Sequence, residues 1–172
     1  KLKERKERRM KAFCDGGDLA EAVGKAIRAI SNKSNNPILD NIKIEASEGT
    51  LTFTATDNEL TVTTGIVGDV DDGGVVLVPG KLFSDFTRKL TGERIAVESA
   101  GNKLMLRYGD SESEFACADP DDYPEIRTVS DAGDLRMTEK DLKDLINKVA
   151  FSVRQDDVRP ILKGVLFEIG ES

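Results

Sequence analysis

Residues 18–48 are DLAEAVGKAIRAISNKSNNPILDNIKIEASE, and residues 141–171 are DLKDLINKVAFSVRQDDVRPILKGVLFEIGE. The second stretch repeats the first without a gap, so that Lys25 returns as Lys148 and the Pro-Ile-Leu triplet at Pro37 returns at Pro160. A spacing of this length has the size of a whole domain, because solenoid repeats are much shorter. The sequence therefore predicts domains of one design in series, with about a third of the second unit present.

Turn signals and hydrophobic periodicity divide the first domain into two similar halves, each a strand, a helix and further strands. The expected helices cover about 18–31 and 80–91, and a third helix is expected over about 138–153. The expected strands are 10–15, 38–46, 50–56, 59–66, 75–78, 93–99, 103–109 and 112–118. The predicted fold class is α+β.

The basic opening of the chain differs from everything that follows it. Residues 1–9 hold six positive and two negative charges, whereas the whole chain has a net charge of −7. We expect residues 1–9 to be a non-native or disordered extension rather than a nucleic-acid-binding arm, because short charged runs are usually solvated. The predicted organisation is this extension, a first domain over 10–128, and the truncated start of a second domain over 129–172.

The composition excludes several kinds of site. Histidine is absent, which removes Ser-His-Asp and Cys-His nucleophiles and the commoner zinc sites. The two cysteines, Cys14 and Cys117, lie on different predicted strands without a metal-type spacing, and we expect two reduced, buried thiols. No apolar stretch is long enough to span a membrane. Any catalysis would have to rest on carboxylates, lysine or metal-bound water. We expect a soluble, cytoplasmic protein.

Basic residues lie on the solvent side of all three predicted helices. In the first helix, Lys25 and Arg28 fall away from the apolar stripe of Leu19, Val23, Ala26 and Ile30. One interpretation is ordinary helix solvation, with lysines paired to nearby acidic residues. The other interpretation is a positive lining that faces a polyanion, which the equivalence of Lys25 and Lys148 favours.

Several short segments together resemble one family, the bacterial DNA polymerase III sliding clamp or beta subunit. The segments are NPILDNI at 36–42, LTFTATD at 51–57, VLVPGKLF at 76–83, DYPE at 122–125 and VAFSVRQDDVRPILKGVLFE at 149–168. They occur in the family's order, and the resemblance runs from Met10 to the end of the chain. It implies the clamp fold, with three similar domains per chain and a head-to-tail dimeric ring whose helices line a hole for duplex DNA.

The resemblance also implies a function and a set of site residues. The protein would be a non-catalytic processivity factor, grouped with DNA-directed DNA polymerase, that binds double-stranded DNA without reading its sequence. It would have no catalytic residues and need no cofactor or metal. The polymerase and the clamp loader would bind through linear motifs. The resemblance implies a DNA contact at Lys33. From the helix faces and the repeat, we expect the DNA-binding lining to comprise Lys25, Arg28, Lys33, Arg88, Lys140, Lys148 and Arg154. The implied rim of the partner-motif pocket is Arg159, Pro160 and Leu162, and Phe115 is implied at the dimer interface.

The family segment that should supply much of the pocket would begin after Ser172. The fragment is therefore expected to be monomeric, to encircle no DNA, and to expose apolar edges in residues 129–172. Leu162 has a second interpretation, as a core residue like its repeat partner Leu39.

Two other functions compete with this one. Acidic runs at 69–74 and 119–122 suggest a carboxylate enzyme or a calcium site, but both fall at predicted turns and the first lacks the later Glu of a calcium loop. The other alternative is a clamp-fold protein-interaction module that does not encircle DNA.

Overall fold

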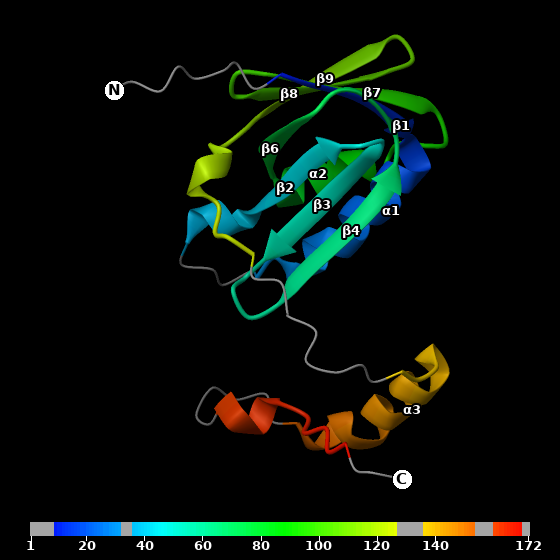
Figure 1. Ribbon diagram of the computed structural model, residues 1–172, viewed down its shortest axis with the longest axis vertical. Coiled ribbons are helices and arrows are strands. Elements are labelled where there is room, and N and C mark those ends of the chain that lie inside the picture. The colour runs from blue at the N-terminus through cyan, green and yellow to red at the C-terminus, as the bar shows by residue number, and fades with distance from the viewer. Residues whose placement is uncertain (1–8, 32–35, 127–135, 154–159, 170–172) are drawn as a thin grey trace. The chain divides into compact units, whose positions relative to one another are not determined.

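The computed structural model describes residues 9–31, 36–126, 136–153 and 160–169 (Figure 1). Contacts divide the chain into two compact units, residues 1–126 (unit 1) and residues 127–172 (unit 2). The predicted domain boundary at 128 and residues 1–8 of the predicted extension lie outside the described residues. Each unit is described by itself.

Unit 1 contains nine strands and two α-helices within its described part. The strands are β1 (Met10–Asp15), β2 (Asn41–Ser47), β3 (Thr50–Thr56), β4 (Thr61–Val67), β5 (Asp69–Asp72), β6 (Gly74–Pro79), β7 (Arg94–Ala100), β8 (Lys103–Tyr108) and β9 (Ser111–Ala116). The helices are α1 (Gly16–Ala26) and α2 (Gly80–Thr87), with 3₁₀ turns η1 (Ile27–Ala29), η2 (Pro37–Asp40) and η3 (Pro120–Asp122).

The two predicted halves exchange their first strands. One sheet has the order β5-β1-β7-β8-β9 (sheet A) and the other has the order β4-β3-β2-β6 (sheet B). Strand β1 pairs with β7 of the second half, and β6 pairs with β2 of the first half, all antiparallel. Neither half can complete its sheet alone, so the halves fold as one body. This topology confirms the predicted class and the prediction of two similar halves.

Both helices start directly from the exchanged strands, and each start is closely packed. A Cβ atom on Gly16 would lie 2.3 Å from the carbonyl oxygen of Thr91, and one on Gly80 would lie 3.0 Å from the carbonyl oxygen of Asp40. Asp15 caps α1, because its Oδ1 accepts hydrogen bonds from the backbone N–H groups of Gly17 and Asp18. Each turn from strand to helix therefore requires glycine, because there is no room for a Cβ atom at its first helical residue.

The core lies between the sheets and the helices. Figure 1 shows α1 and α2 on the same side of sheet B, and α1 contacts β3, β4 and α2. The apolar stripe predicted for the first helix is confirmed, since all four of its members are buried. Strands β1, β2 and β7 alternate between buried and more exposed residues, as strands do in a sheet with one face on a core and the other in water.

Several predicted boundaries were wrong, and the reasons are local. The acidic stretch Asp69–Asp72, predicted as a turn and considered for a calcium site, is strand β5 at the edge of sheet A. Its pairing with β1 is supported by the ion pair Lys11–Asp71 (3.2 Å). The strand predicted from 38 begins only at Asn41, because Pro37 and the Asn36 cap form η2 first. Helices α1 and α2 end earlier than predicted, at Ala26 and Thr87.

Unit 2 repeats the helical part of unit 1 at the spacing of the sequence repeat. Helix α3 (Glu139–Val149), η4 (Ala150–Ser152) and η5 (Pro160–Lys163) stand 123 positions after α1, η1 and η2. Thr138 caps α3 by accepting from the backbone N–H of Asp141, as Asp15 caps α1. Residues 165–169 stand at the repeat spacing from residues 42–46 of β2, but they have no regular structure.

Candidate nucleic-acid interface

The solvent face of α1 and η1 carries charges of both signs. Lys25 and Arg28 are exposed, as predicted, and Asp18 and Glu21 lie on the same face. Lys25 Nζ forms an ion pair with Glu21 Oε1 at 2.6 Å, one helical turn away. The hydrogen bond from Lys25 and its charge lower the pKa of Glu21. Within the described part of the chain, Arg28 has no ion pair.

The solvent face of α2 has a positive excess. Arg88 follows the last residue of the helix and forms an ion pair with Asp85. Lys81 and Lys89 are also exposed, and neither has an ion pair among the described residues. These two lysines were outside the predicted DNA-binding set, although their position off the apolar face of the helix is visible in the sequence.

The two helical faces form one surface. Helices α1 and α2 contact each other, and each turns its opposite side to the core, so their exposed stripes are neighbours. Both helix ion pairs are largely exposed, with side chains at least 55% accessible. Such pairs contribute roughly 0–1 kcal/mol, so a phosphate oxygen can replace the carboxylate partner at little cost. The surface can hold a polyanion loosely through exchangeable charge pairs.

The remaining predicted DNA-binding residues are distributed differently. Lys140 and Lys148 are exposed on α3 in unit 2, with Lys148 in the last turn of the helix. Lys33 and Arg154 lie outside the described residues. In unit 1, the structure therefore places Lys25 and Arg28 on the solvent face of α1 and η1, and Arg88 at the C-terminal end of α2.

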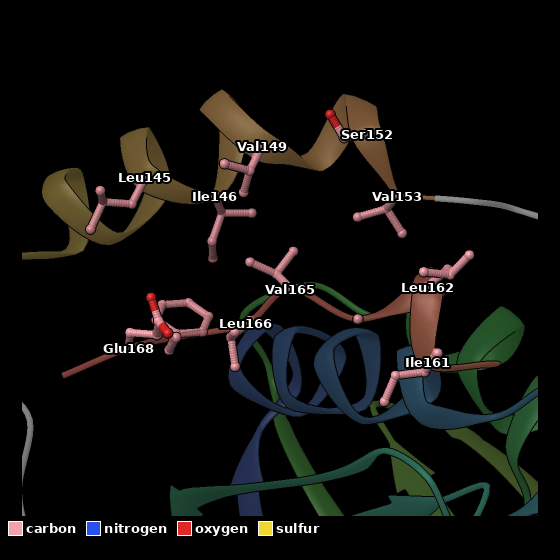
Figure 2. A pocket seen from close by; sticks show the side chains of 12 residues that line it. Leu145, Ile146, Val149, Ser152, Val153, Ile161, Leu162, Val165, Leu166 and Glu168 are labelled. Atoms are coloured by element: carbon pink, nitrogen blue, oxygen red, sulfur yellow. The ribbon is translucent and has the colours of Figure 1, made fainter. Parts of the chain in front are cut away.

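Unit 2 contains an apolar groove of about 670 Å³ (Figure 2). Figure 2 shows Ile146 and Val149 of α3 facing Val165 across it. The lining residues are Leu145, Ile146, Val149, Ser152, Val153, Ile161, Leu162, Gly164, Val165, Leu166, Phe167 and Glu168. Apolar side chains are exposed in the described part of this unit, as expected.

The residues predicted for the partner-motif pocket are only partly described. Leu162 lines the groove and remains 39% exposed, whereas its repeat partner Leu39 is buried in unit 1. Pro160 begins η5. Arg159 lies outside the described residues.

Phe115 lies in the core of unit 1. Its side chain is 4% exposed and packs edge-to-face against Phe83 and Phe86, with ring centroids 5.2 Å apart in each pair. Strand β9, which contains it, is the outer strand of sheet A. A side chain this buried offers no surface to a partner, so a contact at this edge would involve the backbone and exposed residues such as Glu112 and Glu114.

The other candidate chemistry has no support in the described part of the chain. No group of three or more Cys, Asp and Glu side chains there is placed to hold a metal ion. The thiols of Cys14 and Cys117 are free, and burial raises their pKa values to about 12 and about 11, respectively. Protonated thiols are poor nucleophiles. No helix in the described residues has the length and apolar character needed to cross a membrane.

Comparison with known sequences identifies one family. Residues 10–127 match the family described as DNA polymerase III beta subunit, N-terminal domain. The beta sliding clamp of Staphylococcus epidermidis is 32% identical over 148 residues, which cover 81% of this chain and 39% of that protein. The beta sliding clamp of Staphylococcus aureus is 32% identical over 155 residues, covering 85% of this chain and 41% of that protein.

Comparison with solved structures identifies the same family. The crystal structure of the DNA polymerase sliding clamp from Bacillus subtilis matches with a TM-score of 0.84 and 25% identity, over 88% of this chain and 42% of that chain. The chain thus spans about two fifths of the length of these relatives.

Proposed function

The chain belongs to the DNA polymerase III beta-subunit family, and we propose that it is part of a sliding clamp that encircles duplex DNA and tethers the replicative polymerase. Residues 10–128 would form the first clamp domain, and residues 129–172 would begin the second. Residues 1–9 would be an extension outside the fold. The role is mechanical and non-catalytic, and the parent protein would act in the cytoplasm.

The observation that carries this proposal is the shared surface of α1 and α2. A sliding tether needs weak phosphate contacts that exchange quickly, because strong base contacts would stop its movement. Lys25, Arg28 and Arg88 would supply such contacts from the solvent faces of the helices. The ion pairs with Glu21 and Asp85 hold the side chains of Lys25 and Arg88 at the helix surface, where a phosphate group could reach them. We include Lys33, Lys140, Lys148 and Arg154 in the same lining.

The proposal extends to protein partners. Polymerase and clamp-loader motifs would bind at a pocket whose rim includes Arg159, Pro160 and Leu162. The parent protein would form a homodimeric ring, with the β9 edge and its core residue Phe115 near the subunit contact. The exposed β9 backbone supports this placement, since an outer strand can extend a sheet into a second subunit.

A chimera tests the DNA role. Residues 10–127 would replace the matched N-terminal domain of the Bacillus subtilis clamp, and retention of the assembled ring on nicked circular DNA would be measured over a salt series. Arg28→Glu with Arg88→Glu changes the helix surface. Lys11→Glu with Lys43→Glu is the matched control, because these residues are partly exposed, each is ion-paired with a carboxylate, and they lie on β1 and β2 rather than on the two helices or the β9 edge.

We expect the helix variant to lose most of its retention at moderate salt, while the control keeps it. Equal losses in both variants would mean that only net charge matters. If the helix variant retained DNA like the parent, Arg28 and Arg88 would not belong to the lining. A chimera that retained no DNA even without these substitutions would favour the clamp-fold interaction module without DNA encirclement.

A further inference from the structure

The internal repeats of the chain align its three α-helices position by position. Strand β6 and helix α2 begin 64 positions after β1 and α1, respectively. Both helices start at a buried glycine, Gly16 or Gly80, whose Cβ would lie against a backbone carbonyl oxygen. Helix α3 begins 123 positions after α1. Each position of α1 can therefore be compared with its counterparts in α2 and α3.

One pair of opposite charges recurs at the same place in all three helices. The sixth helical residue is acidic, and a lysine follows it four residues later. The acidic residues are Glu21, Asp85 and Asp144, and the lysines are Lys25, Lys89 and Lys148. All six are exposed. Other charges on the solvent face of α1 and η1 are not kept, since Asp18 corresponds to Leu82 and Arg28 corresponds to Gly92.

Helix stabilisation by ion pairing does not account for this recurrence. Glu21 binds Lys25 at 2.6 Å, but Asp85 binds Arg88, three residues later, instead of the lysine at the repeated position. Among the described residues, Asp144 forms no ion pair. Exposed pairs of this kind also add little stability. The repeated feature is therefore a carboxylate beside basic side chains on the solvent face, and not one particular ion pair.

We propose that these three carboxylates weaken the contact between the helices and DNA phosphates by competing for the neighbouring basic side chains. The inference rests on the proposed DNA role of the helix faces. Carboxylate and phosphate oxygens accept the same charge-assisted hydrogen bonds from lysine and arginine. A phosphate therefore gains the cation only by displacing the carboxylate. Without the acids, the helices would hold phosphates more tightly and exchange them more slowly, which opposes sliding.

Neutral amides of the same size and shape test the role of the carboxylates. Glu21→Gln with Asp85→Asn, in the whole 172-residue chain, is the acid variant. Glu45→Gln with Asp71→Asn is the matched control, because each carboxylate is ion-paired with a lysine on β2 or beside β1 and the net charge changes equally. Binding to a short fluorescent DNA duplex would be measured by anisotropy over a salt series, and far-UV circular dichroism would verify that the fold is kept.

We expect the acid variant to bind the duplex roughly fivefold more tightly than the parent at low salt, and the control to change by less than about twofold. The gain should shrink as salt screens the charges. In a Lys25→Gln background, Glu21→Gln should have a smaller effect, because the cation that the carboxylate competes for is gone. Asp144→Asn should tighten binding as well, since α3 repeats the arrangement.

The possible failures separate this inference from the DNA role. A parent chain that binds the duplex in a salt-dependent manner, with no gain in the acid variant, would overturn this inference alone. Equal gains in the acid variant and the control would also overturn it, because only net charge would then matter. An undiminished effect of Glu21→Gln without Lys25 would replace competition by simple repulsion. Parent and acid variant that both fail to bind at low salt would overturn this inference together with the proposed DNA contact.

Discussion

Replacing Gly16 by alanine adds one methyl group where β1 turns into α1. The new Cβ would lie 2.3 Å from the carbonyl oxygen of Thr91 and 3.3 Å from that of Glu93. Neither atom can rotate away, because both belong to the backbone, and the Gly16 N–H donates to the Glu93 oxygen at 2.9 Å. Overpacking of this kind costs about 1–3 kcal/mol or more. We expect Gly16→Ala to lower the free energy of unfolding of unit 1 by at least this amount.

Gly24 in the same helix is the matched control. A Cβ there would have no atom within 4 Å, and the position is inside α1. Gly24→Ala should raise the free energy of unfolding by roughly 0.5–1 kcal/mol, because alanine loses less backbone entropy in a helix. Urea unfolding followed by far-UV circular dichroism measures both variants. The packing argument is refuted if Gly16→Ala is as stable as the parent, or if the two variants shift in the same direction.

Three further predictions concern the core and the cap. Phe115→Ala should cost about 3–5 kcal/mol in the same urea assay, because its ring is buried against Phe83; a loss below ~1 kcal/mol would place the ring outside the core. Burial raises the pKa of Cys14 from 9.0 to about 12, so the folded state holds its proton more tightly. The contribution of Cys14 to the free energy of unfolding should be constant below pH 9 and fall between pH 9 and about 12, and Cys14→Ala should reduce that fall in pH-dependent unfolding. Asp15→Ala should lower the stability of unit 1 by about 1 kcal/mol through loss of the α1 cap, whereas Thr138→Ala should leave the unit 1 transition unchanged.

The repeat and the hydrophobic periodicity predicted most of the fold because they depend on local patterns. The inward positions of α1, including Leu19 and Val23, follow from helical spacing and are buried. Strand β5 was missed because DVDDGG has the composition of a turn, and only its pairing with β1 makes Asp69–Asp72 extended. Long-range pairing of this kind leaves no signal in a window of a few residues.

The sequence could predict which residues belong to the candidate site, but not how tertiary packing arranges them. Periodicity placed Lys25, Arg28 and Arg88 on solvent faces, which the structure confirms. The contact between α1 and α2, which joins these faces into one surface, depends on tertiary packing. The burial of Phe115 likewise depends on the position of α2, because its neighbours Phe83 and Phe86 come from that helix.

The measurement that tests the clamp function most directly is topological retention. The chimera that carries residues 10–127 would be loaded on closed circular DNA, and the bound fraction would be measured before and after the DNA is linearised. A sliding clamp held by encirclement stays on the circle and is lost from the free ends. Retention that survives linearisation, or a chimera that never remains on the circle, would contradict the proposed function.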